Sequence, residues 1–166
     1  MIKMTNSTPD NQEAIEKIRE LIQGIDTAML TTVSEEGLVS RPMKTQDIEF
    51  DGDLWFLTKK DTDKFHELLQ NRQVNVAYAG KSFVSIRGEA ELVNSTEKLK
   101  ELWNPVYEQL LETNVDDPNL VLIKVQAEAV EYWDAGNKFK MARFLFRRLM
   151  GKSGEGTNMN RTVELD

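Results

Sequence analysis

The sequence predicts a mainly β, α+β fold, an antiparallel barrel of about six strands with helices at its periphery. Three observations favour this class. Short, apolar, β-branched stretches recur along the chain and are separated by turn sequences such as 35–37 and 51–53. The stretch 83–93 alternates apolar and polar residues, which is typical of a strand with one buried face. Between these strands lie stretches with the 3.6-residue period of amphipathic helices.

The composition is that of an ordinary globular domain. The chain has 166 residues, of which 40% are hydrophobic and 30% charged, and its formal net charge is −7. This length supports one sizeable core, and the acidic balance argues against general affinity for nucleic acid. Because the chain has no cysteine and only one histidine, His66, we expect no disulfide, no metal centre and no Ser-His-Asp triad. We also expect no membrane span, no signal peptide and a cytoplasmic location.

The elements are expected in the order of a meander with inserted helices. The first helix is predicted over 11–25, where isoleucine and leucine form one stripe and Gly24 marks the end. The second is predicted over 61–71, and the third starts near Thr96 and is interrupted at Pro105. Strands are predicted over 28–34, 38–46, 47–50, 54–58, 74–79, 83–93 and 119–133.

The C-terminal part is predicted to contain an amphipathic helix over 137–151. Its basic residues extend over 138–152, opposite an apolar stripe. We expect this stripe to pack on the barrel or on a partner subunit, and contact with an anionic membrane or nucleic acid is the alternative. The domain plan is a flexible N-terminus over 1–10, a single domain over 11–151 and a flexible, glycine-rich tail over 152–166.

Arg41 and Pro42 stand in the middle of a predicted strand. A strand tolerates proline at a sheet edge, so this pair predicts an edge that binds an anion rather than another strand. Thr58 ends a later strand, and Thr62 and Lys64 begin the second helix, whose N-terminus offers unpaired N–H groups. If the meander brings Arg41 beside that helix, the corner suits a phosphate monoester. For each residue alone, a solvated surface charge or a helix cap is the alternative.

Six motifs in this order are AMLTTVSEEGLVSRPM, LWFLTKKDTDK, VSIRGEAELV, KELWNP, DDPNLVLIKV and EYWD. Together they resemble the general stress protein branch of the pyridoxamine 5′-phosphate oxidase-like proteins, over roughly residues 12–151. The resemblance implies a six-stranded antiparallel split barrel with peripheral helices. It also implies FMN bound at the interface of a homodimer.

The resemblance further implies a set of cofactor contacts. Arg41 would reach the FMN phosphate, the stretch up to Gln46 would follow the ribityl chain and the isoalloxazine, and Lys64 matches a phosphate-binding lysine. Trp133 matches a tryptophan that contacts flavin from the partner subunit. The implied cofactor-binding residues are Arg41, Pro42, Met43, Lys44, Thr45, Gln46, Leu57, Thr58, Thr62, Lys64, Trp133 and Arg143.

Departures from the oxidase pattern bear on activity. Asp63 stands where the oxidases place an arginine, Gln46 where they place a substrate-phosphate lysine, and Phe139 and Met141 at their Arg-x-His pair. We therefore expect little or no pyridoxamine phosphate oxidase activity, and an FMN-dependent oxidoreductase or flavin reductase acting on a small, aromatic or nicotinamide substrate. The alternatives are a non-catalytic stress protein that sequesters or senses FMN, and a β-barrel binding module without flavin.

Other conspicuous residues have plainer interpretations. His66 is expected to face solvent or a loop rather than to act in acid–base chemistry. Trp55 and Trp103 are expected in the core or at a dimer interface. The adjacent carboxylates of 115–119 are expected in a turn rather than a metal site.

Overall fold

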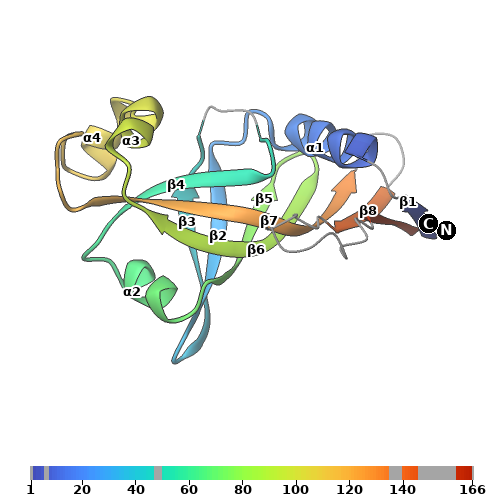
Figure 1. Ribbon diagram of the computed structural model, residues 1–166, viewed down its shortest axis with the longest axis horizontal. Helices are drawn as coiled ribbons and strands as arrows, with labels where there is room; N and C mark the ends of the chain where they lie inside the picture. Colours follow the sequence, from blue (N-terminus) through green and yellow to red (C-terminus); the bar gives the residue numbers. More distant parts are fainter. Residues whose placement is uncertain (1, 6–7, 47–49, 135–139, 146–159, 166) are drawn as a thin grey trace.

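A curled antiparallel sheet forms the body of the protein (Figure 1). The computed structural model describes residues 2–5, 8–46, 50–134, 140–145 and 160–165, and describes side chains over 12–46 and 50–134. The strands are β1 (Ile2–Thr5), β2 (Thr27–Ser34), β3 (Gly37–Lys44), β4 (Asp53–Lys59), β5 (Gln73–Ala79), β6 (Phe83–Val93), β7 (Leu120–Asp134), β8 (Lys140–Leu145) and β9 (Asn160–Leu165). The helices are α1 (Thr8–Ile22), α2 (Asp63–Gln70), α3 (Thr96–Leu102) and α4 (Val106–Leu110).

The strands β2 to β7 form the half-barrel that the sequence predicted. Within the described residues the sheet order is β1-β9-β8-β7-β6-β5-β2-β3, and β4 pairs with the first half of β7. No ladder joins β3 to β4 in the described chain, so the barrel is split between these two strands. The predicted α+β fold with peripheral helices is therefore confirmed. The alternating stretch 83–93 coincides with β6.

The helices cover different parts of the sheet (Figure 1). α3 and α4 lie together at one end, α1 lies at the other end, and α2 lies below the sheet in this view. α1 is followed by Gly24 at a φ of +78°, a backbone conformation that glycine adopts without steric cost, as the sequence predicted for the end of this helix. No helix among the described residues is long and apolar enough to cross a membrane.

Two clusters of buried side chains result from this arrangement. The larger fills the half-barrel, where Leu30, Val76, Ile86, Ile123 and Val130 are all fully buried. The smaller lies between the outer side of β4 and β7 and the pair α3 and α4, and its members are Leu57, Leu99, Leu102, Tyr107, Leu120 and Leu122. Since β4 contributes to both clusters on alternate residues, it links the barrel to the helical end.

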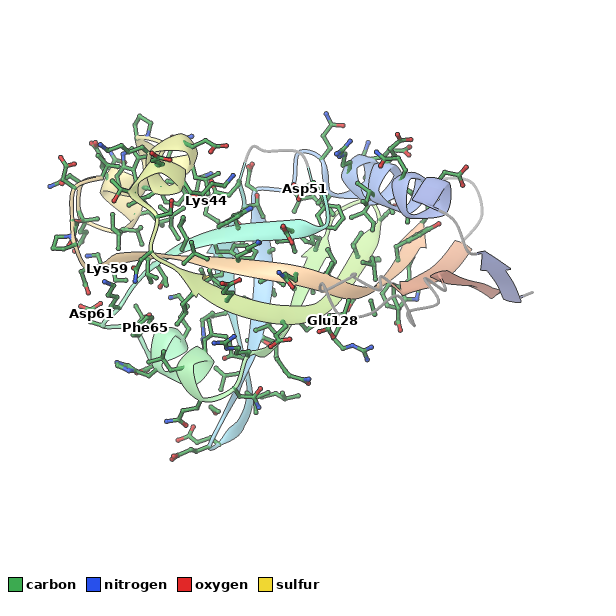
Figure 2. The ribbon with its side chains drawn as sticks, viewed as in Figure 1. Lys44, Asp51, Lys59, Asp61, Phe65 and Glu128 are labelled. Carbon is green, nitrogen blue, oxygen red and sulfur yellow. The ribbon has the colours of Figure 1, made fainter. Side chains whose placement is uncertain are left out.

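A β-bulge bends β7 where it faces β6. Arg87 pairs with Ala129 and Gly88 with Ala127, so Glu128 is the extra residue, and its side chain projects away from the sheet (Figure 2). A Cβ atom added at Gly88 would lie 2.2 Å from the carbonyl oxygen of Gln126. Glycine is therefore required at position 88 because two backbones approach closely there.

The helix expected over 137–151 is wrong for residues 140–145, which form β8. β8 pairs with residues 129–134 of β7, along the edge that β4 leaves open. Without β8 that edge would present unpaired backbone N–H and C=O groups, so pairing overrides the helical period. The rest of 137–151 lies outside the described residues, as do 47–49 of the short strand expected over 47–50.

Parts of the two ends of the chain, expected over 1–10 and 152–166, also lie in the sheet or in α1. Residues 2–5 and 160–165 pair with each other as β1 and β9, and α1 begins at Thr8. β9 pairs in turn with β8. The ends therefore extend the sheet because β8 provides a free edge that each added strand satisfies by backbone hydrogen bonds.

Candidate functional site

Arg41 lies on the inward face of β3, at the outer edge of the sheet. Its partner across the β2–β3 ladder is the buried Leu30, so both side chains point toward the barrel and toward α2. β3 pairs only with β2 in the described sheet, which confirms the edge predicted from Pro42. Arg41 Nη2 donates to Glu67 Oε2 of α2 at 2.9 Å, and Thr32 Oγ1 donates to the same oxygen at 2.5 Å.

The second terminal nitrogen of Arg41 is available for a ligand. Arg41 Nη1 is buried and has no hydrogen-bond partner within the described part of the chain. An unpaired guanidinium N–H group inside a protein carries a cost of about 1–3 kcal/mol, more when charged. A strong oxygen acceptor placed beside Arg41, such as a phosphate, would remove this cost.

The start of α2 adds hydroxyl and amide groups to this corner. Thr62 occupies the N-cap position but its side chain does not cap the helix, because its Oγ1 donates to the carbonyl oxygen of Lys59 at 2.8 Å. The same Oγ1 lies 3.2 Å from Oγ1 of Thr58, which is buried. The amides of the first turn of α2 are thus left without a side-chain acceptor from Thr62, which favours an anion at this end.

Lys64 completes the positive side of the corner. Burial lowers the pKa of Lys64, the neighbouring Arg41 cation lowers it further, and Asp63 and Glu67 act in the opposite direction. For Glu67, burial raises the pKa, but the hydrogen bonds from Thr32 and Arg41 and the nearby cations outweigh burial and hold it below its ordinary value. Two cations and two carboxylates therefore lie at this corner. A bound phosphate would be paired by Arg41 and Lys64 and opposed by Asp63 and Glu67.

The structure brings together the four residues from which the sequence predicted a phosphate site: Arg41, Thr58, Thr62 and Lys64. Sequence reasoning missed Glu67, which accepts from the Arg41 guanidinium, and Thr32, which donates to Glu67. Glu67 is three residues after Lys64 on one helix, a spacing that places both on the same face. This spacing is the feature of the sequence that could have indicated Glu67 as a member of the site.

The other implied residues of β3 lie further along the same strand. Pro42 is exposed opposite Met29, and Met43 is buried in the barrel core. The Thr45 hydroxyl donates to the carbonyl oxygen of Ile25 at 2.6 Å. Lys44 and Gln46 lie toward α3 and α4.

At that helical end, Gln46 Nε2 donates to the hydroxyl of Tyr107 on α4. Lys44 lies beside α3 and α4 with its Nζ 6.0 Å from the centre of the Tyr107 ring (Figure 2). Together with Trp103, these residues line a cavity of about 190 Å³. The cavity is polar and contains no arginine among its described lining residues.

Three implied residues lie away from the Arg41 corner. Leu57 is buried in the smaller cluster, on the face of β4 opposite to Thr58. Trp133 is half-buried near the end of β7 and pairs with Met141 of β8. Arg143 is placed in β8, opposite Glu131. β8 lies at the opposite end of the molecule from α2 (Figure 1).

The plainer interpretations of other residues hold where they are described. His66 is exposed and makes an edge contact with Phe65, with 5.5 Å between ring centres. Trp55 packs against the smaller cluster, with the Lys98 ammonium 4.9 Å from its ring centre. Asp117 accepts hydrogen bonds from Thr113 and from the backbone of Asn119, which is a turn.

Comparison with known proteins identifies the family. The family model described as "Pyridoxamine 5'-phosphate oxidase like" matches residues 13–154. The chain belongs to this family. Among the members, it is similar to general stress protein 26 of Bacillus subtilis (strain 168), with 26% identity over 136 residues, covering 78% of this chain and 94% of that protein.

Solved structures of this pyridoxamine 5′-phosphate oxidase-like family agree. General stress protein 26 from Bacillus anthracis str. Sterne is 26% identical, covers 72% of this chain and 93% of its own, and superposes with a TM-score of 0.64. The general stress FMN/FAD binding protein from the phytopathogen Xanthomonas citri is 28% identical, covers 77% and 93%, and has a TM-score of 0.66. The likeness to general stress proteins that the sequence motifs suggested is therefore confirmed.

Proposed function

We propose that this protein binds FMN, with the phosphate at the corner formed by Arg41, Thr58, Thr62 and Lys64. One observation carries the proposal: the buried Nη1 of Arg41 has no partner in the described chain and lies in a corner that also contains the first turn of α2. FMN is the anion to expect because a relative of known structure is an FMN/FAD binding protein. The donor set fits a phosphate monoester, with two cations, two hydroxyls and helix amides.

The rest of the cofactor would follow the edge of β3 toward Gln46. Gln46 is five positions after Arg41, about 16 Å of extended chain, a span that suits a ribityl chain and a tricyclic ring. The inward face of β3 between the two is closed by the buried Met43. The free edge of the strand, including Pro42 and Lys44, is therefore the proposed path.

A homodimer is part of the proposal. Thr58 pairs with Val121, and Trp133 is twelve residues further along β7, about 40 Å on an extended strand. This separation along β7 supports a two-fold related copy that brings its Trp133 and Arg143 to the partner's corner. The exposed apolar side chains of Met29, Leu38 and Phe83 support a buried interface on this sheet.

We propose that the bound flavin acts in an oxidoreductase or flavin reductase on a small aromatic or nicotinamide substrate, in the cytoplasm. FMN supplies hydride and electron transfer, and this chain has to bind it, orient it and limit water access. The Gln46–Tyr107 hydrogen bond occupies the position where a substrate phosphate would need a lysine. The described lining there has one cation, Lys44, and one carboxylate, Glu101. A doubly charged substrate would find no net positive charge, which supports little or no pyridoxamine phosphate oxidase activity.

A non-catalytic role in sequestering or sensing FMN is the second candidate. It is supported by the same Gln46–Tyr107 bond, since two neutral side chains that satisfy each other leave little to orient a second substrate. Steady-state bleaching of the flavin by NADH or NADPH in the presence of an electron acceptor supports the enzyme. Bound flavin that neither nucleotide reduces supports the second candidate.

The absorption spectrum of the purified protein, followed by titration of the flavin-free chain with FMN, tests the cofactor. We expect flavin bands near those of free FMN and saturable binding that phosphate-free riboflavin does not reproduce. Light scattering on the same sample gives the mass in solution, expected to be that of two chains. A colourless protein that fails to bind added FMN would refute the proposal.

A further inference from the structure

A cavity of about 350 Å³ opens at the end of the barrel remote from α2. It lies between the last turn of α1, the chain that enters β2, the residues after β3, and β4. Part of its wall is apolar and comes from Phe50, Leu54 and Phe56. The volume and this wall are suited to a single aromatic ring with a short side chain.

This cavity is separate from the Arg41 corner. None of Arg41, Thr58, Thr62 and Lys64 lies in its described wall. The buried Met43 stands between Arg41 and Thr45, and Thr45 and Gln46 are the residues after β3 that reach the cavity. A ligand here would therefore not need the phosphate-binding side chains.

Tyr78 supplies a polar group inside this cavity. Its side chain is on the wall and only 4% exposed. Within the described residues its hydroxyl makes no hydrogen bond, and it is not among the fully enclosed unpaired atoms, so it reaches the open space of the cavity. A buried tyrosine hydroxyl normally finds a partner, so this one is available to a bound molecule. Burial raises the pKa of Tyr78 well above its ordinary value, so the hydroxyl stays neutral and can donate.

Three carboxylates and one cation belong to the described lining of the cavity. Glu20, Asp26 and Asp53 lie in the lining, and Glu20 and Asp26 are exposed. The one cation in the described lining, Arg19, donates through Nε to the carbonyl oxygen of Phe50 at 2.5 Å. Glu20 lies 3.8 Å from the Lys17 ammonium, and Asp53 lies 3.8 Å from the Lys124 ammonium. Asp26 is the carboxylate of the described lining without a lysine beside it, and it favours a ligand with a positive end.

We propose that this cavity is a second binding site, for a small aromatic amine. The ring of the amine lies against Phe50, Leu54 and Phe56, an oxygen or nitrogen acceptor on the ring takes the Tyr78 hydroxyl, and the ammonium lies at the mouth beside Glu20 and Asp26. The site uses none of the four residues of the phosphate corner and shares Gln46 with the far end of the proposed FMN path, so its test is separate from that of the proposed function.

Three probes of similar size separate these contributions in calorimetric titrations at millimolar concentration. Tyramine has the ring acceptor and the ammonium, phenethylamine lacks the acceptor, and 3-(4-hydroxyphenyl)propionate replaces the ammonium with a carboxylate. We expect tyramine to bind best, phenethylamine less well, and the propionate not at all. No binding of either amine, or equal binding of the propionate, would overturn the proposal.

Variants assign the contacts. We expect Tyr78→Phe to weaken tyramine about 2- to 10-fold, the range for one neutral hydrogen bond, and to leave phenethylamine unchanged. We expect the double variant Glu20→Gln/Asp26→Asn to weaken both amines, whereas Glu16→Gln, an exposed glutamate of α1 outside the lining, leaves them unchanged. The double variant changes only exposed carboxylates, so it tests the site even if Tyr78→Phe unfolds.

Titrations with FMN present complete the test. We expect saturating FMN to leave tyramine binding unchanged, and Arg41→Ala to weaken FMN without affecting tyramine. Mutual displacement of FMN and tyramine would show that the cavity holds the flavin ring, and would overturn the proposal of a second site. Tyramine binding without FMN binding would support the second site and refute only the proposed function.

Discussion

Replacing Arg41 with alanine is the sharpest test of the phosphate corner. The guanidinium uses Nη2 for Glu67 at 2.9 Å and leaves Nη1 for a ligand. A hydrogen bond to a charged group contributes about 1.5–3 kcal/mol, so we expect the dissociation constant for FMN to rise about 10- to 150-fold. Quenching of flavin fluorescence on binding measures this constant directly.

Arg41→Ala also leaves Glu67 without its partner, so stability has to be measured beside affinity. We expect a loss of about 1–3 kcal/mol in the free energy of unfolding, from urea titrations. Arg41→Lys keeps the charge but offers no planar fork, and we expect an intermediate affinity. Arg72→Ala removes an exposed arginine after α2 and is the matched control. Unchanged FMN affinity in a folded Arg41→Ala variant would refute the reasoning.

Three further predictions concern Glu67 and Lys64 at the phosphate corner and Gly88 at the β-bulge. Because the pKa of Glu67 is lowered, its stabilising contribution is present above the ordinary carboxyl pKa and is lost as the pH falls through the lowered value. Urea unfolding at acidic pH should thus show a shallower pH slope in Glu67→Gln than in the unmodified protein. The pKa of Lys64 is also lowered, so FMN affinity should fall as the pH rises through the lowered pKa, below the ordinary value of 10.5. Lys64→Gln should remove this pH dependence, and FMN titrations across alkaline pH measure it. Gly88→Ala should lower the free energy of unfolding by about 2–3 kcal/mol, because its Cβ would meet the Gln126 carbonyl oxygen. A thermal unfolding midpoint equal to that of the unmodified protein would contradict the close approach of the two backbones.

The balance of charge at the corner separates this chain from a strongly cationic phosphate site. Asp63 is exposed at the first position of α2, next to Lys64, and Glu67 shares the Arg41 guanidinium. Both carboxylates reduce the positive field before any anion binds. We therefore expect the proposed FMN binding to be reversible. Reversible binding is compatible with either of the two functions proposed.

Local periodicity was sufficient for the barrel strands. The alternation over 83–93 survives in β6 because one face of the strand is buried throughout. Proline and arginine in the middle of a strand were likewise enough to place β3 at an edge. The helix expected over 137–151 failed at 140–145 because a helical spacing of apolar residues says nothing about which sheet edge is vacant.

The phosphate corner, too, was predicted from the sequence only in part. The sequence named Arg41, Thr58, Thr62 and Lys64 by residue type and by their places near strand ends and a helix start. It did not show that Glu67, which also accepts from Thr32, pairs with one terminal nitrogen of Arg41 and leaves the other unpaired, because residues 32, 41 and 67 meet only when β2, β3 and α2 pack together.

The amino-acid sequence by itself determined the fold class, the family resemblance, the edge strand and the chemistry gathered for an anion, since these depend on local pattern and residue type. Only the tertiary structure decided that β8 completes the edge of β7, that Gln46 is held by Tyr107, and that a cavity with the buried Tyr78 hydroxyl lies beyond Met43. The reason is that hydrogen-bond satisfaction and burial depend on residues distant along the chain, which periodicity cannot pair.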